Sequence, residues 1–257
     1  MEMVTQSYKD NFDCDLPVPY AHDKSETYRI KHKLLYPINV ARNIARITAT
    51  THFVFPSDIE LSTVYDFPQR FLKMMREHHE YLNRTNPSVF VIPIFEITEN
   101  STVPNTKTEL LKMLKNHSAQ VFHAKLCSPC HKIPYLREWT AAKEYDGLKV
   151  FKVTKRTGRH KQWEPFYVGT QKEPLFDERI TWEGQSNKIT QAYTMCLLDY
   201  EFLVLDNVFL IHKPGIKKSK EQMKKYPKVV TKTNALIKNV IKPELKHLYG
   251  NREGCAL

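Results

Sequence analysis

The chain has 257 residues, of which 41% are hydrophobic, so it is long enough to bury a substantial core. It carries 39 Lys and Arg residues against 28 Asp and Glu residues, a formal net charge of +11. Its 13 Phe, 13 Tyr and 3 Trp residues exclude intrinsic disorder, and no apolar run is long enough to cross a membrane. The N-terminal sequence also lacks a signal-peptide pattern, so we expect a soluble, basic globular protein.

The first predicted elements are an irregular segment, a strand and a helix. Residues 1–27 are polar and contain two prolines, which disfavour regular structure. A short strand is expected at 28–35, and a helix is expected to begin at Asn39, its candidate N-cap. The helix has an apolar face and an opposite polar face, formed by Val40, Ile44 and Ile47 and by Arg42, Asn43 and Arg46.

Strands and helices continue to alternate and then become mixed. An apolar run from His52 predicts a buried strand that ends in acidic residues. The elements expected after it are a helix at 67–83, a central strand at 88–97, a helix at 108–115, a strand-poor stretch, a short strand at 163–168, a helix at 189–198, a strand pair at 200–205 and 208–211, and a helix at 231–249 interrupted at Pro243. This order predicts an α/β fold with an irregular C-terminal half.

The positive charge makes nucleic acid a candidate partner. Much of the excess lies after residue 212, where the lysines are not interleaved with the aromatic residues that stack on bases. The sequence has no zinc-finger, helix-turn-helix or RNA-recognition pattern. We therefore expect no nucleic-acid partner and interpret the lysines as a solvated helix face, from which a few could meet a phosphorylated or acidic ligand.

Two of the five cysteines, Cys127 and Cys130, are separated by two residues and followed by His131. This spacing resembles a haem-attachment string and also half of a zinc site. Because the sequence has no second pair at this spacing, structural cysteines or a disulfide are the favoured interpretation.

Three N-glycosylation sequons begin at Asn83, Asn100 and Asn116. Some sequons are expected by chance in a chain of this composition. Their grouping nevertheless favours a secretory compartment.

Asp58 and Glu60 form the strongest local pattern. Two carboxylates two residues apart in an extended backbone share one face, so they can hold a hard divalent cation that also bridges a diphosphate. The alternative is a solvated loop with ordinary acidic residues, because this spacing is common.

A second pattern follows the apolar strand at 208–211. The imidazole of His212 could complete a metal site, while Lys213, Lys217 and Lys218 could neutralise phosphate. Gly215 would allow a close backbone approach. A structural histidine is the alternative interpretation.

The third pattern combines aromatic residues with carboxylates. Trp163, Phe166 and Tyr167 surround Glu164, and Asp177 and Glu178 follow. Aromatic faces beside carboxylates suit the C–H faces and hydroxyls of a sugar acceptor, and one carboxylate could be a general base. Core aromatics with acidic residues at a helix start explain the pattern equally well.

An ordered series of motifs resembles glycosyltransferase family 49. The series consists of Tyr36–Arg46, Val54–Leu61, Val91–Ile97, Leu126–Cys130, Trp163–Val168, Pro174–Arg179 and Phe209–Lys213. The family includes glucuronyltransferases and is similar to the C-terminal catalytic domain of LARGE-type xylosyl/glucuronyltransferases. The order of the motifs is more specific than any one of them.

The resemblance implies a GT-A-type, Rossmann-like nucleotide-sugar fold with a mixed sheet at 28–250, followed by a tail at 251–257. It implies Mn2+-dependent, inverting transfer of glucuronate from UDP-glucuronate to a terminal xylose of an O-mannosyl glycan of the dystroglycan type. It further implies a type II membrane protein of the Golgi lumen.

The resemblance also gives the candidate residues their roles. The implied metal ligands are Asp58, Glu60 and His212, the donor-binding residues are Asn39, Arg42, Arg46, Lys213 and Lys218, the acceptor-binding residues are Trp163, Glu164, Phe166 and Tyr167, and the catalytic base is Asp177 or Glu178. At the second position of the metal motif the family has Asp, and this sequence has the longer Glu60.

In the family, a membrane anchor and initial strand–helix units precede the first of these motifs. We expect those units, which hold much of the uridine, to be truncated here, and membrane association to depend on the missing anchor.

Two other functions stay open. The chain could transfer another UDP-sugar, such as N-acetylglucosamine or xylose. It could instead be a catalytically weak glycan-binding or partner protein that retains the acceptor side. A homo-oligomer, or a complex with other Golgi glycosyltransferases, is also an expectation.

Overall fold

The computed structural model describes residues 27–213, 215–216 and 225–257. The chain divides into two compact units, residues 1–36 and Pro37–Leu257. In the first unit, the described part contains the short helix α2, Tyr28–Lys31, whose backbone bonds begin at Thr27. The predicted strand at 28–35 was therefore wrong. A strand needs a neighbour, and the described residues of this unit provide none.

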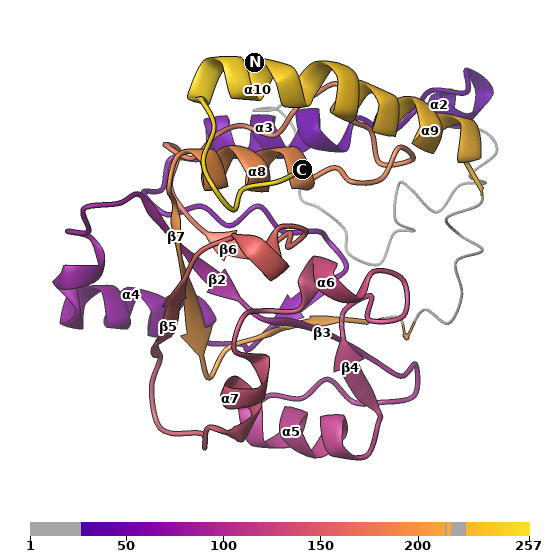
Figure 1. Cartoon of the computed structure of the whole chain (residues 1–257). Helices are drawn as coiled ribbons and strands as arrows, with labels where there is room; N and C mark the ends of the chain where they lie inside the picture. The colour runs from indigo at the N-terminus through magenta and orange to yellow at the C-terminus, as the bar shows by residue number, and fades with distance from the viewer. Residues whose placement is uncertain (1–26, 214, 217–224) are drawn as a thin grey trace, which may run out of the picture. The chain divides into compact units, whose positions relative to one another are not determined.

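The second unit is built on two mixed four-stranded sheets (Figure 1). The strand orders are β5-β7-β2-β6 and β1-β8-β3-β4. The strands are β1 Leu61–Thr63, β2 Ser88–Ile92, β3 Ile94–Ile97, β4 Ala119–Val121, β5 Lys149–Thr154, β6 Phe166–Val168, β7 Glu201–Asp206 and β8 Leu210–His212. This mixed α/β architecture agrees with the predicted GT-A-like fold.

The central strand changes sheet at Pro93. The prediction of one strand at 88–97 was wrong, because β2 and β3 belong to different sheets. β2 pairs in parallel with β7, and β3 pairs in parallel with β8. The backbone N–H of Leu210 donates to the carbonyl of Pro93 at 2.8 Å. The connection from β2 to β3 and the connection from β7 to β8 therefore pass from one sheet to the other next to each other. For the same reason, β7 and β8 do not pair with each other as predicted.

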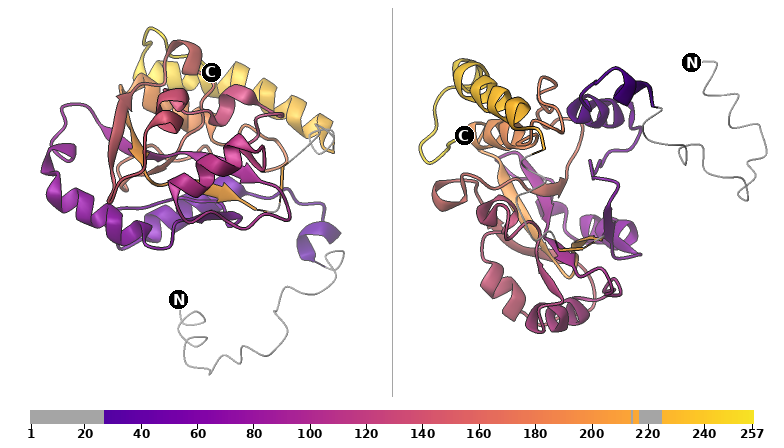
Figure 2. Two further views of the ribbon diagram at one scale, coloured as in Figure 1. Left: turned by 90° about the horizontal axis from the view of Figure 1, so that it is seen from below. Right: turned by 90° about the vertical axis from the view of Figure 1, so that its right-hand side faces the viewer.

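The helices cover both sides of the sheets. In Figures 1 and 2, α3, α8, α9 and α10 lie on one side, and α5 and α7 lie on the other. The helices of this unit in the described residues are α3 Ile38–Thr48, α4 Phe67–Glu77, α5 Lys107–Lys115, α6 Ser128–His131, α7 Leu136–Ala141, α8 Ile189–Leu197, α9 Pro227–Leu236 and α10 Lys242–Tyr249, with short 3-10 turns at His79–Tyr81 and Gly158–His160.

The predicted helices at 108–115 and 189–198 are confirmed as α5 and α8. α5 begins with a capping box in which Thr106 and Glu109 bond each other's backbone N–H groups. The helix predicted at 67–83 ends earlier, at Glu77, and a separate 3-10 turn follows. The C-terminal helix is not interrupted at Pro243, because a π-helical segment, Ile237–Ile241, joins α9 to α10 and places Pro243 in the first turn of α10.

The strand predicted from His52 was wrong. The run that begins at His52 forms only an isolated bridge between Val54 and Gly169, and the strand β1 follows the acidic residues instead of preceding them. The stretch predicted to be poor in strands carries the three-residue strand β4 and the six-residue strand β5, which pairs along β7.

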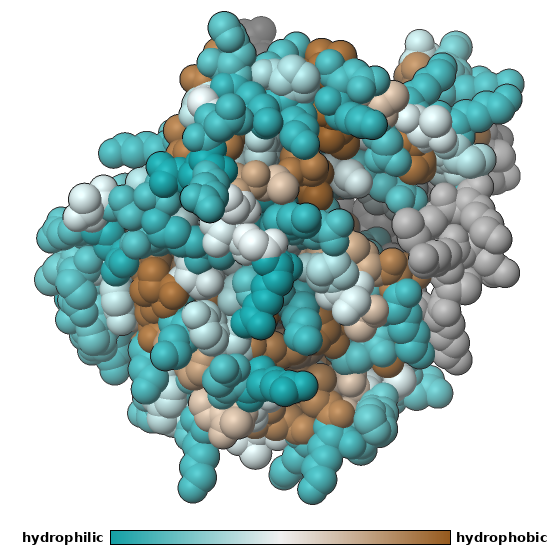
Figure 3. Space-filling view, in the orientation of Figure 1, coloured by the Kyte–Doolittle hydropathy of each residue, from teal (hydrophilic) through white to brown (hydrophobic). Residues whose placement is uncertain are grey.

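One large core lies between the sheets and the helices. α4 contributes its apolar face, with Phe71 3% exposed and Met74 1% exposed. A smaller cluster of Ile180, Ile237 and Ile241 packs under the C-terminal helices. The surface in Figure 3 is largely hydrophilic, with hydrophobic side chains in several separate patches, one of them near α5 and α7. A shallow hollow of about 350 Å³ lies between these helices, and no predicted site residue lines it.

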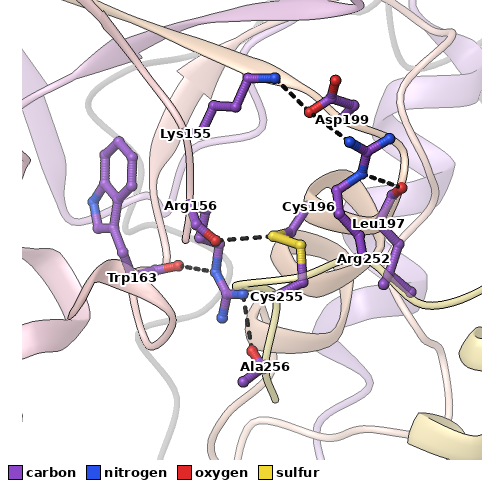
Figure 4. Close-up of a disulfide and its surroundings, with 9 residues drawn as sticks. All are labelled: Lys155, Arg156, Trp163, Cys196, Leu197, Asp199, Arg252, Cys255 and Ala256. Carbon is purple, nitrogen blue, oxygen red and sulfur yellow. Dashed lines mark hydrogen bonds and ion pairs between the residues drawn. A yellow bond between two sulfur atoms is a disulfide. The ribbon is translucent and has the colours of Figure 1, made fainter. Parts of the chain in front are cut away.

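Two disulfides, Cys127–Cys130 and Cys196–Cys255, confirm the interpretation of the cysteines. The second ties the C-terminal residues to α8 (Figure 4). Beside it, the buried guanidinium of Arg156 donates to the carbonyl oxygens of Trp163 at 2.7 Å and Ala256 at 3.1 Å. The residues at 251–257 are thus fastened to the same unit as the sheets.

Within the described part of the chain, none of the helices has the length and apolar character of a membrane span.

Candidate functional site

The polar face of α3 is buried, and it holds the loop at 170–187. Asn39 donates to the carbonyl oxygens of Asp177 and Asn187, both at 2.8 Å. Arg46 donates to the carbonyl oxygens of Pro174 at 2.9 Å and Glu173 at 2.8 Å. The side chains of Asn39 and Arg46, which were predicted to bind the donor, therefore donate their hydrogen bonds to backbone carbonyls of the loop.

The candidate bases Asp177 and Glu178 lie at the edge of this loop. Asp177 accepts two bonds from the guanidinium of Arg179, one to each carboxylate oxygen, at 3.0 and 2.7 Å. Glu178 is exposed, and Asn43 donates to one of its oxygens at 2.9 Å. Because Arg179 covers both oxygens of Asp177, Glu178 is the better placed of the two to accept a proton.

Asp58 lies between two cations. Its Oδ1 is 2.5 Å from Nη2 of Arg42, and its Oδ2 is 3.3 Å from Nζ of Lys188. Burial alone would raise the pKa of Asp58, but Lys188 and Arg42 outweigh it and hold that pKa at about 2. Asp58 is therefore ionised at neutral pH.

Lys188 is a site residue that the sequence did not reveal. It occupies the N-cap position of α8, and its ammonium lies 4.0 Å from the centre of the Phe166 ring. Burial lowers the pKa of Lys188, whereas Asp58 acts in the opposite direction. Its sequence position, directly before a predicted helix, was the only available signal.

Glu164 and His131 connect the turn closed by the Cys127–Cys130 disulfide to the cluster formed by Asp58, Arg42 and Lys188. The backbone N–H of Glu164 donates to the carbonyl of Cys130 at 2.8 Å, and the carbonyl of Glu164 lies 3.2 Å from Nδ1 of His131. Burial raises the pKa of Glu164. Burial also lowers the pKa of His131 well below its usual range, and the nearby cation Lys188 lowers it further. His131 is therefore neutral at physiological pH.

Glu60 and His212 meet where β1 and β8 pair. Leu61 lies opposite His212 in the antiparallel register, so Glu60 stands beside the end of β8. Oε2 of Glu60 is 3.4 Å from Nε2 of His212. Glu60 is 62% exposed, whereas His212 is 2% exposed and packs on the ring of Phe122. The sequence predicted both residues as metal ligands; the structure brings their side chains together, and their role as ligands stays a prediction.

A divalent cation fits Glu60 and His212 better than it fits Asp58. A carboxylate oxygen and an imidazole nitrogen are both ligands that Mn2+ accepts. Asp58 does not share their face as predicted, because a turn closed by a 3.1 Å bond from Leu61 N–H to the Asp58 carbonyl replaces the extended backbone. In the described ranges, no three His, Cys, Asp or Glu residues are grouped as a metal site.

The segment after β8 carries the remaining predicted donor residues. Lys213 is exposed directly beyond His212, and Lys217 and Lys218 lie outside the described residues. The backbone at position 215 requires glycine. Its φ is 132°, and a Cβ atom at this position would lie only 2.6 Å from Cγ of Glu99. The close approach predicted for this glycine is therefore to another part of the chain.

The predicted aromatic acceptor surface is in the core. Trp163, Phe166 and Tyr167 are 1%, 3% and 4% exposed, and Trp163 packs against Phe202. Their rings present no face to solvent, which favours the interpretation as core aromatics that the sequence left open. Glu164 beside them is also buried.

The three sequon asparagines, Asn83, Asn100 and Asn116, are exposed and lie outside the helices and strands. Attachment of a glycan requires such accessibility. Modification at these positions stays a prediction.

Comparison with known proteins places the chain in a family. The sequence profile of a family described as glycosyl-transferase for dystroglycan matches residues 2–250. The chain belongs to this family. The predicted resemblance to glycosyltransferase family 49 is thereby confirmed.

Individual relatives of the dystroglycan glycosyltransferase family agree with this assignment. Mouse beta-1,4-glucuronyltransferase 1 is 31% identical over 226 residues, which cover 87% of this chain and 51% of the relative. The zebrafish protein of the same name is 30% identical over 74% of this chain and 43% of its own length. Rat xylosyl- and glucuronyltransferase LARGE2 is 30% identical over 70% of this chain and 25% of its own length. The chain thus spans about half the length of the glucuronyltransferases that it matches.

Proposed function

We propose that this chain carries the active site of an inverting glycosyltransferase that moves glucuronate from UDP-glucuronate to a terminal xylose of an O-mannosyl glycan. Membership of the family and the names of the relatives support the reaction class. The single observation that carries the proposal is the convergence of Glu60 and His212 at the β1–β8 edge, 3.4 Å apart. They lie far apart in the sequence and offer a mixed oxygen and nitrogen donor pair, of which Glu60 is exposed and His212 is buried.

Glu60 and His212 would hold Mn2+ in this function. A bound Mn2+ supplies positive charge that stabilises the diphosphate of the leaving UDP. The protein fixes the imidazole by burying it against Phe122, while the exposed Glu60 stays accessible to the ligand. Lys213, exposed directly beyond His212, extends the positive charge at this edge.

Glu178 would act as the base that accepts the proton of the acceptor hydroxyl. The amide of Asn43 holds one of its oxygens at 2.9 Å, and the side chain is exposed, so the carboxylate is both oriented and accessible. Asp177, the other candidate, would instead hold Arg179 and the loop. Inversion requires one such base opposite the leaving group.

The same proposal implies the donor, the acceptor and the cellular location of the protein. The donor would be a nucleotide sugar, the acceptor a xylose-terminated glycan, and the location the Golgi lumen. The two disulfides support an oxidising compartment.

The test is transfer of glucuronate to an aryl β-xyloside with MnCl2, measured for the wild type and two variants. Glu60→Gln removes a charged ligand at the β1–β8 edge, and we expect turnover to fall by about 100-fold or more. Glu77→Gln is the matched control, because Glu77 is similarly exposed and forms an ion pair with Lys73 on α4. Equal turnover in the two variants would remove Glu60 from the site.

Transfer of xylose is a second candidate, favoured by the similarity to LARGE2, whose name includes xylosyl transfer. Replacing UDP-glucuronate with UDP-xylose and UDP-N-acetylglucosamine in the same assay distinguishes these donors. If none is turned over but the xyloside still binds, the chain is a glycan-binding protein.

A further inference from the structure

Lys188 is a buried ammonium whose hydrogen-bonding capacity is only partly used. Among the described residues, its Nζ makes one hydrogen bond, the 3.3 Å contact with Asp58, and it lies over the Phe166 ring. An ammonium group has three N–H donors. Its side chain is 14% exposed, so the remaining donors have little access to bulk water. A largely buried ammonium with unused N–H donors is energetically unfavourable unless a further hydrogen-bond acceptor binds to it.

Arg42 stands on the other side of the same carboxylate. Its Nη1 donates to the side-chain oxygens of Asn39 at 3.1 Å and Asn187 at 2.7 Å, which fix the guanidinium plane. Its Nη2 reaches Asp58, and the side chain is 7% exposed. Both cations are therefore held in place by the fold before any ligand binds.

The charges at this point do not balance within direct contact distance. Two cations contact Asp58, which supplies one negative charge. Asp58 is the most exposed of the three, at 28%, so the cluster opens toward solvent on its carboxylate side. Glu164 also acts on both cations, but its burial disfavours its charged form. An anion that approaches beside Asp58 would complete the cluster.

We propose that Arg42 and Lys188 form an anion-binding site beside Asp58 that holds one anionic group of the donor. The anion would be part of the nucleotide sugar, either the carboxylate of the uronic acid or the diphosphate. In this arrangement Asp58 holds the two cations apart and oriented, and Lys188 contacts the ligand. The inference rests on the proposed function for the identity of the ligand, and on the geometry alone for its charge.

The experiment compares Lys188→Met with Lys73→Met, an exposed lysine on α4 that serves as the matched control. Binding of UDP, UDP-glucose and UDP-glucuronate is measured by calorimetry in EDTA, so that no metal contributes. If the site holds the uronate carboxylate, Lys188→Met weakens UDP-glucuronate by about 10-fold or more and leaves UDP and UDP-glucose unchanged. If it holds the diphosphate, all three ligands weaken alike. Unchanged affinity for all three overturns the proposal.

Wild-type protein provides a readout that does not depend on the folding of a variant. In EDTA, either glucuronate or inorganic pyrophosphate should raise the thermal midpoint, whereas glucose should not. No shift with either anion also overturns the proposal.

These binding measurements are separate from the turnover assay. If Lys188→Met weakens anion binding but the wild type turns over no UDP-sugar, the proposed reaction is contradicted and the anion site is supported. If the wild type turns over UDP-glucuronate but Lys188→Met binds all three ligands unchanged, the anion site is overturned and the proposed reaction is supported.

Discussion

Helices α3 and α4 have the same length, 11 residues, and both are amphipathic, but they bury opposite faces. α4 places Phe71 and Met74 in the core. α3 buries Asn43 and Arg46 instead, and leaves Ile44 56% and Ile47 61% exposed. An apolar stripe therefore identifies a helix without telling which side faces the protein.

The difference comes from what each helix packs against. α4 lies against the hydrophobic core, where removing apolar surface from water is favourable. α3 lies against the loop at 170–187, whose backbone groups need hydrogen-bond partners when they are buried. Its polar side chains supply those partners, for example at Phe176 and Pro174. The two charged residues of α3, Arg42 and Arg46, are both on this buried face.

The largest effect is expected in α4. Phe71→Ala would leave a cavity beside the rings of Phe53 and Phe90 and lower the free energy of unfolding by about 3–5 kcal/mol. Urea unfolding measures this value. Leu72→Ala, on the half-exposed side of the same helix, should cost less than half as much. Equal losses would mean that α4 does not bury one face selectively.

A smaller but still large effect is expected on the polar face of α3. Asn43→Ala would leave the backbone N–H and carbonyl of Phe176 without their side-chain partner, which should cost about 3 kcal/mol. Thr48→Ala, at an exposed position of the same helix, is the control for urea unfolding. A loss below about 1 kcal/mol for Asn43→Ala would show that the loop finds other partners.

The free energy of unfolding should also depend on pH, because Arg42 on the polar face of α3 pairs with Asp58. The pKa of Asp58 is lowered from 3.8 to about 2 in the folded protein, so its ionised form stabilises the fold above pH 3.8. This contribution, about 2 kcal/mol, is lost as the pH falls from 3.8 through 2. Unfolding free energies measured between pH 5 and pH 2 should therefore fall more steeply for the wild type than for Asp58→Asn. Parallel curves would contradict the pairing of Asp58 with Arg42 and Lys188.

The smallest effect is expected on the apolar face of α3. Ile47→Lys should change stability by less than about 0.5 kcal/mol, because Ile47 is exposed and a cation suits the last turn of a helix. Met74→Lys on α4 is the contrasting variant and should prevent stable folding. A loss of about 2 kcal/mol or more in Ile47→Lys would show that something covers this face of α3.

The same contrast explains what the sequence could predict. α5 was predicted because its N-cap and the spacing of its leucines are local signals. The change of sheet at Pro93 was not, since a continuous apolar run reads as one strand whichever sheet its two halves join. The buried face of α3 depended on the loop at 170–187, which no local pattern connects to it.

The site was predictable to the same degree. Glu60 and His212 were identified because each stands next to an apolar segment, and the sheet brings them together. Lys188 was missed because its role depends on the positions of Asp58 and Phe166, far away in sequence. Trp163 and its neighbours were ambiguous because core and sugar-binding aromatics have the same composition.

The Cys196–Cys255 disulfide has a practical consequence for handling the protein. It joins residues 59 positions apart, and Arg156 beside it also holds the carbonyl of Trp163, next to Glu164. Dithiothreitol in a purification buffer would therefore release the C-terminal residues and loosen a segment that borders the candidate site. Production through the secretory pathway of a host cell, in buffers free of thiols, is the appropriate route to protein with its disulfides intact.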